Sequence, residues 1–423
     1  MPIEYQPPKR FPLDVAGQIF PAARTRSWSC IVHISFLLKE EIDLLRLRQA
    51  LEDIHQRFPS FFVSLRSGLF SYSLARVDNL NIIEPAPRCP CRSIDIFSKN
   101  TPVLRVYYGG RRVSVEMPHF VADGGAALIF AKTLLIRYLQ LGGVEIPQDS
   151  SLPDFTQPPC PEEWEDSYIK NYTRHTPKPE HQPFAYQYRP PVSKNHLQVM
   201  HGEIPLEEIL PLAKKRGLTL TEYLACVYLY AFYHGDRKAR SSRRPIRISV
   251  PISLRSIYAS KSLRNFSAYC RVGIYPRDKD CYTFEDIIAC VRGKLAQAQK
   301  KENVHKFLCQ NTGMTINPFL RAIPNFIRRP VMFAGFYLTG EFTQTAPLSN
   351  LGRINLPEAA ADHVESTACL VNASPAMKLN CTLLSDARLL HIYFSSDSEA
   401  TDVQRAFFRF LEDDGACARL VAF

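Results

Sequence analysis

The chain has 423 residues, of which 46% are hydrophobic and 22% are charged. This length exceeds the roughly 250–300 residues at which a single core stops growing, so we expect two domains or two halves that share an interface. The hydrophobic fraction excludes a disordered chain. No apolar run in the sequence approaches the ~18 residues that a membrane span needs, so none is predicted.

The start of the chain and its cysteines favour a cytoplasmic protein. Residues 1–5 carry an early acid and lack the basic and then apolar order of a signal peptide. Most of the twelve cysteines are isolated, so we expect reduced thiols. The close pair Cys89 and Cys91 has no second pair at a zinc-binding spacing, and the sequence therefore predicts no metal site.

The formal net charge is +11, with short basic clusters at residues 214–216, 237–244 and 328–329. Phosphate groups of nucleic acid or of a small ligand such as coenzyme A (CoA) would favour such clusters, and so would a solvated surface. Because the clusters are separated and no nucleic-acid-binding motif accompanies them, we do not expect a nucleic-acid partner.

The first third of the chain has a mixed α/β pattern. Residues 27–38 predict a strand, and residues 40–58 predict a helix that Pro59 ends. Residues 61–65 and 69–75 alternate in the manner of a hairpin. The helix is assigned from apolar residues that recur on one face, namely Ile42, Leu45, Leu51, Ile54 and Phe58.

A second predicted hairpin leads to the most informative segment. Residues 104–108 and 113–117 alternate on either side of Gly109-Gly110, a pair that tolerates the positive φ of a two-residue turn. The second strand runs directly into His119, and residues 126–141 then predict an apolar helix. His119 is therefore expected in a strand-to-helix turn, a frequent position for catalytic side chains.

The remainder divides into a linker and a second half. Residues 147–195 are rich in proline, with a short helix predicted near residues 162–172. We expect an N-terminal half over 1–146, a crossover over 147–195 and a C-terminal half over 196–423. In the last of these, helices are predicted over 206–216, 221–233, 284–299 and 399–411, and strands over 246–250, 268–274, 377–384 and 389–394.

The segment from His119 to Gly124 carries the clearest candidate chemistry. Histidine is the side chain best suited to accept a proton near neutral pH. Asp123 has the spacing to bond the imidazole, to cap the next helix or to pair with a cation elsewhere. Gly124 and Gly125 allow a tight turn and close approach of a ligand. The structural alternative is a loop histidine followed by a helix cap.

The pattern His-x-x-x-Asp-Gly resembles the signature of the chloramphenicol acetyltransferase-like superfamily, which includes alcohol acetyltransferases and the condensation domains of peptide synthetases. Other segments resemble the alcohol acetyltransferase-like branch in the same chain order. They are Arg10-Phe11-Pro12-Leu13-Asp14, Arg57-Phe58-Pro59-Ser60-Phe61, Val250-Pro251-Ile252-Ser253-Leu254-Arg255, Leu263-Arg264-Asn265-Phe266 and Ser349-Asn350-Leu351-Gly352.

This resemblance implies an α/β fold of two similar halves, each a mixed sheet flanked by helices, with a tunnel between them. It implies that His119 is the general base and that Asp123 pairs with Arg255 to hold the loop together with Gly124. Ser349 and Asn350 are candidates for contacts to an oxyanion or substrate, as is Asn265. The alternatives are a surface arginine at 255 and a polar turn at 349–350.

The resemblance also implies the reaction. An acyl group, most simply acetyl, would pass from a CoA thioester to a hydroxyl acceptor, with acyl-CoA as co-substrate and no tightly bound cofactor or metal. A monomer is expected, with acyl-CoA and a small-molecule alcohol as partners. Pro118 precedes His119 where condensation domains usually have a second histidine, which favours ester formation. Two alternatives stay open: transfer from an acyl-carrier protein to an amine or alcohol, and a catalytically silent binding protein.

Overall fold

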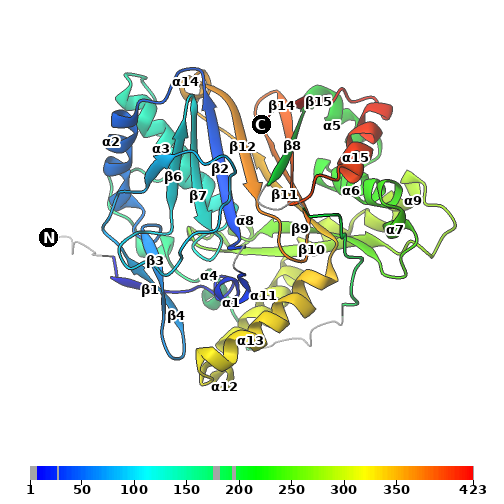
Figure 1. The fold of residues 1–423 in the computed structure, drawn as a ribbon, viewed down its shortest axis with the longest axis horizontal. Helices are drawn as coiled ribbons and strands as arrows, with labels where there is room; N and C mark the ends of the chain where they lie inside the picture. The colour runs from blue at the N-terminus through cyan, green and yellow to red at the C-terminus, as the bar shows by residue number, and fades with distance from the viewer. Residues whose placement is uncertain (1–6, 26–27, 175–181, 193–196, 423) are drawn as a thin grey trace.

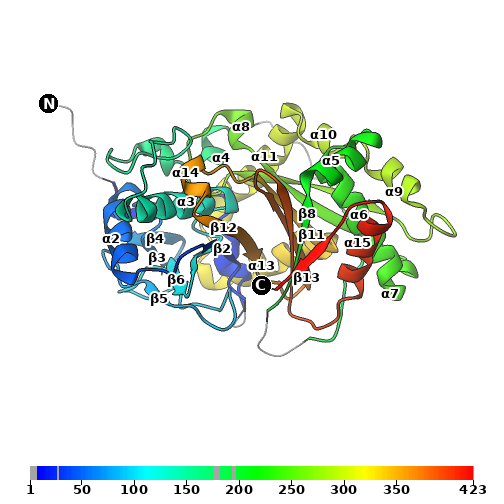
Figure 2. The ribbon, with the colours of Figure 1, turned by 90° about the horizontal axis from the view of Figure 1, so that it is seen from above.

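The computed structural model describes residues 7–25, 28–174, 182–192 and 197–422. Two halves lie side by side, each built on a sheet with helices against it (Figure 1). Seen from above, α2 (Leu44–Ile54) and α15 (Asp402–Asp413) lie at opposite outer sides, with the sheets between them (Figure 2). The α/β architecture of two mixed sheets flanked by helices, as predicted, is confirmed.

The sheet of the first half has five strands in the order β12-β2-β7-β6-β5, antiparallel except for β5 and β6. The hairpin predicted at residues 104–117 is confirmed, and Gly110 in its turn has φ +53°. The apolar α3 (Gly124–Leu141) follows β7 and packs against the sheet and α2. The strands are β2 (Ile31–Leu38), β5 (Ile83–Pro85), β6 (Arg105–Gly109), β7 (Arg112–Pro118) and β12 (Val364–Val371).

A small antiparallel sheet extends this half in the order β1-β4-β3. Its strands are β1 (Arg10–Pro12), β3 (Val63–Ser67) and β4 (Tyr72–Arg76), so the hairpin predicted over residues 61–75 is confirmed. The chain enters from β1 and continues past Asp14 to the short helix α1 (Ile19–Ala23). This entry segment contacts the second half, because Asp14 accepts a hydrogen bond from Asn265.

The sheet of the second half has seven strands in the order β10-β9-β11-β13-β14-β8-β15. Its centre is parallel, with β11 between β9 and β13, and the remaining pairs are antiparallel. The strands are β8 (Gln198–Pro205), β9 (Ile246–Ser253), β10 (Ser267–Ile274), β11 (Ala346–Arg353), β13 (Leu379–Ser385), β14 (Leu389–Ser396) and β15 (Arg419–Val421).

The four helices predicted in the second half are present, one of them with a break, whereas the helices over 301–316 and 325–335 were not predicted. The helix predicted over 284–299 is interrupted at Gly293, whose φ of +72° belongs to the left-handed region. The helices are α5 (Leu206–Lys215), α6 (Leu220–Gly235), α7 (Arg237–Arg240), α8 (Arg255–Tyr258), α9 (Phe284–Val291), α10 (Lys294–Ala298), α11 (Lys301–Ile316), α12 (Pro318–Arg321), α13 (Asn325–Gly335) and α14 (Glu358–Ala361).

The two halves are interlocked rather than joined by one linker. β12, from the C-terminal part of the sequence, pairs antiparallel with β2 and so belongs to the first sheet. The proline-rich stretch forms α4 (Ser167–Lys170), and Arg57 pairs with Glu163 in the turn before it. Tyr168 donates from its hydroxyl to the carbonyl of Ser267 at 2.6 Å. The proline-rich stretch is therefore attached to both halves, through Arg57 and Ser267.

No helix within the described ranges is long and apolar enough to cross a membrane. All twelve cysteines are described, and none is in a disulfide.

Candidate active site

His119 lies immediately after β7, where the sheet of the first half ends and the chain turns into α3. Its backbone N–H donates to the carbonyl of Cys30 at 2.8 Å, which anchors the turn to the entry of β2. The imidazole stacks on Phe20 of α1, with ring centroids 4.7 Å apart and planes inclined by 29°. The ring is half-buried, so it is fixed on one face while part of the residue stays accessible.

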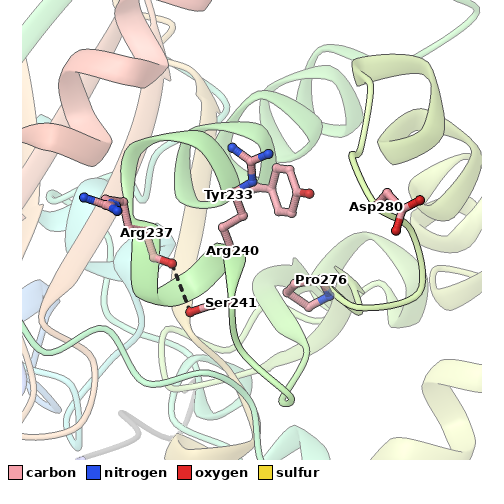
Figure 3. Close-up of a pocket in the computed structure, with 6 residues that line it drawn as sticks. All are labelled: Tyr233, Arg237, Arg240, Ser241, Pro276 and Asp280. Carbon is pink, nitrogen blue, oxygen red and sulfur yellow. Dashed lines mark hydrogen bonds between the residues drawn. The ribbon is translucent and has the colours of Figure 1, made fainter.

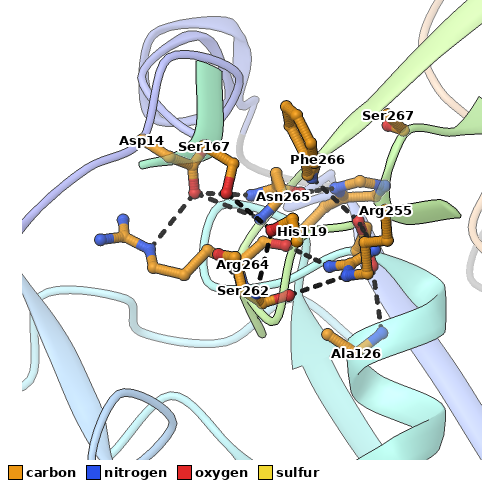
Figure 4. Close-up of polar contacts among 12 residues, drawn as sticks. Asp14, His119, Ala126, Ser167, Arg255, Ser262, Arg264, Asn265, Phe266 and Ser267 are labelled. Atoms are coloured by element: carbon orange, nitrogen blue, oxygen red, sulfur yellow. Dashed lines mark hydrogen bonds and ion pairs between the residues drawn. The ribbon is translucent and has the colours of Figure 1, made fainter. Parts of the chain in front are cut away.

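Asn265 of the second half bonds the imidazole directly (Figure 4). Its Oδ1 lies 2.9 Å from Nδ1 of His119, while its Nδ2 donates to Oδ2 of Asp14 at 3.1 Å. The backbone N–H of Asn265 also faces Oδ2 of Asp14, at 3.4 Å. Three segments that are distant in sequence thus form one chain of hydrogen bonds, from Asp14 through Asn265 to Nδ1 of His119.

These contacts determine which nitrogen of the imidazole carries the proton. A carboxylate only accepts hydrogen bonds, so the side of the Asn265 amide that faces Asp14 is its NH₂ group. Its carbonyl oxygen then faces His119, and Nδ1–H of His119 donates to it. The neutral imidazole is left with its lone pair on Nε2. This is the protonation state that a general base requires.

Asp14 is fully buried, and several hydrogen-bond donors hold its carboxylate in place. Its Oδ1 accepts from the backbone N–H of Gly17 at 2.6 Å, and Nε of the buried Arg264 lies 3.4 Å from its Oδ2. Burial raises the pKa of the Asp14 carboxyl, and Arg264 together with the hydrogen bonds from Gly17 and Asn265 opposes that rise. Asp14 therefore orients Asn265 from inside the protein rather than contacting a substrate.

Asp123 lies at the N-cap of α3 and has donors on both carboxylate oxygens. Oδ1 accepts from the backbone N–H of Ala126 at 3.0 Å, whereas Oδ2 accepts from Arg255 at 2.8 Å and from the backbone N–H of Phe266 at 3.0 Å. The expected ion pair with Arg255 is present, and no hydrogen bond joins Asp123 to His119 within the described part of the chain.

Arg255 fixes the loop that carries Asn265. Besides the Asp123 carboxylate, its guanidinium donates to the carbonyls of Ser262, at 2.7 Å, and Arg264. Burial alone would raise the pKa of Asp123, but the charge of Arg255 and the hydrogen bonds outweigh it and hold that pKa below its usual value. Asp123 is thus a structural carboxylate that couples the two loops of the site.

Gly124 leaves room for the second half to approach. A Cβ built on Gly124 would lie 3.4 Å from a side-chain carbon of Leu351 in β11. The end of β11 therefore reaches the loop through Leu351. The amide of Asn350 instead donates to Thr221 at 2.9 Å, and Ser349 lies opposite Thr382 in the sheet. Within the described part of the chain, no hydrogen bond joins Ser349 or Asn350 to His119.

Sequence reasoning missed Asp14, Phe20 and Arg264 as site residues. Asp14 and Arg264 stand within the segments used for the resemblance, but nothing in their local patterns shows that they meet. Asp14 and Asn265 are separated by 251 positions. The available signal for Asp14 was its place between the apolar Leu13 and Val15, since a carboxylate that is buried with such neighbours requires partners.

Two of the three basic clusters lie on the outer side of the second half, whereas Arg328 and Arg329 lie on α13, which packs against α1. Arg237 and Arg240 line a cavity of about 370 Å³ together with Tyr233 and Asp280 (Figure 3). Figure 1 places their helix, α7, at the far side of the second half from β7. The third residue of the cluster at 214–216, Arg216, pairs with Asp414. Neither cluster therefore adjoins His119.

No family model matches the sequence, and no curated protein matches it either. Solved structures do match the fold. TRI101 of F. sporotrichioides, complexed with coenzyme A and T-2, has a TM-score of 0.66 at 11% identity, over 98% of this chain and 100% of that one. Polyketide synthase associated protein 5 from Mycobacterium tuberculosis has a TM-score of 0.59 at 15% identity, over 95% and 96% of the two chains.

The first condensation domain of the calcium-dependent antibiotic synthetase is also similar, with a TM-score of 0.60 at 13% identity over 98% of this chain and 99% of that one. The chain therefore has the fold that the sequence resemblance implied. TRI101 and this condensation domain share that fold. At these identities the likeness concerns the fold, and the chemistry has to be argued from the residues of the site.

Proposed function

We propose that this protein transfers an acyl group, acetyl in the simplest case, from a CoA thioester to a hydroxyl acceptor. His119 removes the hydroxyl proton through Nε2 as the oxygen attacks the thioester carbonyl. The tetrahedral intermediate collapses, the carbon–sulfur bond breaks, and the departing thiolate receives the proton from His119. One ester forms and one thiol is released, so no covalent acyl-enzyme and no redox partner is needed.

The observation that carries the proposal is the bond between Nδ1 of His119 and Asn265. It leaves Nε2 as the acceptor, and the same contact stabilises the imidazolium that forms when Nε2 takes the proton. A histidine that only caps or packs a loop does not require an amide oriented by a buried carboxylate. Asp123 does not compete for the role because its oxygens already accept from Arg255, Ala126 and Phe266.

Two features support CoA as the carrier of the acyl group. TRI101, which has the same fold, was crystallised with coenzyme A. The site segment carries one histidine, preceded by Pro118, rather than an adjacent pair. The net charge of +11 is compatible with a ligand that bears several phosphates. Ser349, with its backbone N–H, and Asn350 are our candidates for the oxyanion contact, because they lie next to Leu351, through which β11 reaches the loop at Gly124.

The test is release of free thiol from acetyl-CoA in the presence of a panel of alcohols and amines. We expect acceptor-dependent release by the wild-type protein and strongly reduced release by His119→Ala. His363→Ala, which changes a histidine outside the site, is the matched control. Release with amines but not alcohols would contradict the acceptor assignment. No release with any acceptor, in a protein that binds CoA, would favour a silent binding protein.

The likeness to a condensation domain favours one second candidate, transfer from an acyl-carrier protein. Calorimetric titration separates the two donors. If neither acetyl-CoA nor CoA binds at millimolar concentration while an acylated carrier protein does, the donor is carrier-bound. Binding of CoA should weaken as salt rises, because exposed phosphate contacts are screened over about 8–10 Å at near-physiological ionic strength.

A further inference from the structure

A cluster of side chains that could bind a metal ion lies away from His119, on the strands β8 and β14 of the second sheet. His201, Glu203 and His391 are all buried, with exposed fractions of 4%, 7% and 2%. His201 and Glu203 are two positions apart on β8 and so share one face of the strand. His391 lies directly opposite Glu203 on the antiparallel β14, and its ring therefore reaches the same face.

This face is the inner one, turned toward the first half. A Cβ on Gly202 would collide with the ring of Phe408 in α15, so Gly202 points outward and its neighbours on β8 point inward. The adjacent Tyr393 donates from its hydroxyl to the carbonyl of Thr367 on β12, across the interface between the sheets, at 3.0 Å. The strands β8, β14 and β15 lie together near the C-terminus in Figure 1.

The three ligand atoms converge. Nε2 of His201 lies 3.2 Å from Nδ1 of His391, and Oε1 of Glu203 lies 3.8 Å and 3.6 Å from these two nitrogens. Two ligand atoms of a tetrahedral zinc ion at 2.0–2.1 Å are separated by about 3.3–3.4 Å. Oε1 is too far from either imidazole for a hydrogen bond, but a shift of a few tenths of an ångström would suit a shared ion.

The surrounding residues orient the outer atoms of two ligands. His391 directs Nε2 to Oδ2 of Asp386 at 3.0 Å, which places its proton there and leaves the lone pair of Nδ1 turned inward. Arg419 donates to Oε2 of Glu203, which leaves Oε1 facing the imidazoles. Carboxylate partners of this kind fix the tautomer and orientation of histidines that bind metals.

We propose that His201, Glu203 and His391 bind one divalent transition-metal ion, zinc in the first instance. Two imidazole nitrogens and one carboxylate oxygen form a ligand set that suits zinc, cobalt or iron(II). Water or a small anion would complete the coordination, and the positive charge of Arg419, which donates to Glu203, favours an anion.

The site is structural rather than catalytic. Tyr393, opposite His201 on β14, reaches Thr367 of β12, and the strand registers carry this position through β2 to Val113 at the start of β7. His119 follows the other end of that strand. The two sites are thus separated by roughly the length of β7, about 20 Å. An ion here would tie β8 to β14 at the inner face of the second sheet. The proposal does not depend on acyl transfer. No spacing in the sequence predicted this site, since His201 and His391 are 190 positions apart in the chain.

The experiment uses the full chain, freed of any affinity tag and treated with a chelator. Calorimetry with Zn²⁺ and absorption spectroscopy with Co²⁺ should show one ion per chain, and Zn²⁺ should raise the unfolding temperature. Each of His201→Ala, His391→Ala and Glu203→Gln should abolish stoichiometric binding. Asp386→Asn leaves the three ligands in place and should weaken binding by about 10–100-fold.

His363→Ala provides the control for adventitious binding by surface histidines and should bind as the wild type does. Circular dichroism establishes that each variant is folded, and Asp386→Asn keeps the test informative if a ligand variant does not fold. The proposal is overturned if the folded wild type binds neither ion stoichiometrically. It is equally overturned if the folded ligand variants bind as tightly as the wild type.

Discussion

His119 and Asp123 belong to one short segment between β7 and α3, yet their surroundings differ in kind. Asp123 is buried, and both its oxygens accept hydrogen bonds from the protein. His119 is half-buried and bonded through Nδ1. The two residues of this motif therefore have different roles. Asp123 joins the two halves, and His119 keeps Nε2 available to a substrate. The following predictions test that division in order of expected effect.

Replacement of His119 should give the largest loss of activity with little loss of stability. His119→Ala removes the base, which commonly costs a factor of about 10²–10⁴ in turnover. The ring of His119 is only half-buried and contributes little to the hydrophobic core, so the free energy of unfolding should change only slightly. Steady-state kinetics and denaturant unfolding measure the two effects. A variant that turns over like the wild type would reject His119 as the base.

Replacement of Asp123 or Arg255 should instead lower the free energy of unfolding strongly. Asp123→Ala or Arg255→Ala leaves one buried charge without its partner, which costs roughly 3–5 kcal/mol of stability. The double variant should be less destabilised than the sum of the two single variants, because the second change removes the stranded charge. Denaturant unfolding of all four proteins provides the double-mutant cycle. Strict additivity would show that the pair does not couple the halves.

Asn265 should affect the reaction by positioning the base. Asn265→Ala removes the acceptor for Nδ1–H and frees the imidazole to rotate, and misplacement of a catalytic group by about 1 Å can cost up to 10²-fold in rate. The loss should appear in kcat with KM little changed, and the pH dependence of kcat should shift. A change confined to KM would instead identify Asn265 as a substrate contact.

The smallest effect concerns acid. The folded protein holds the pKa of Asp123 below its usual value of 3.8, so the charged carboxylate stabilises the fold at higher pH. That contribution is lost as the pH falls through the lowered pKa. The stability difference between the wild type and Asp123→Asn should therefore shrink as the pH drops below about 4. Unfolding midpoints at several pH values measure this, and a constant difference would contradict it.

The sequence predicted those parts of the fold that depend on local pattern. The hairpin at Gly109-Gly110, the helix after His119 and the helices α5, α6, α9 and α15 follow from periodicity and turn residues, whereas α11 and α13 were not predicted. The break at Gly293 was missed, because a single glycine inside an apolar pattern does not by itself indicate a backbone conformation with positive φ. The position of β12 in the first sheet was missed as well, since strand exchange between halves leaves no local signal.

Prediction of the site shows the same limit. The resemblance identified His119, Asp123, Arg255 and Asn265 as candidates, and these four come together around one loop. The contribution of Asp14 could not be predicted, because it acts on His119 only through Asn265. Contacts of this kind depend on how the halves pack, and a single sequence does not contain that information in any short pattern.

The central claim is that Asp14 and Asn265 fix the tautomer of His119, and nitrogen NMR tests it most directly. The protein would carry ¹⁵N-labelled histidine, and the spectrum of His119→Gln would assign one of the eleven histidines to position 119. At a pH where this imidazole is neutral, we predict a protonated Nδ1 and an unprotonated Nε2. Asn265→Ala should mix the two tautomers. A proton on Nε2 in the wild-type protein would contradict the account.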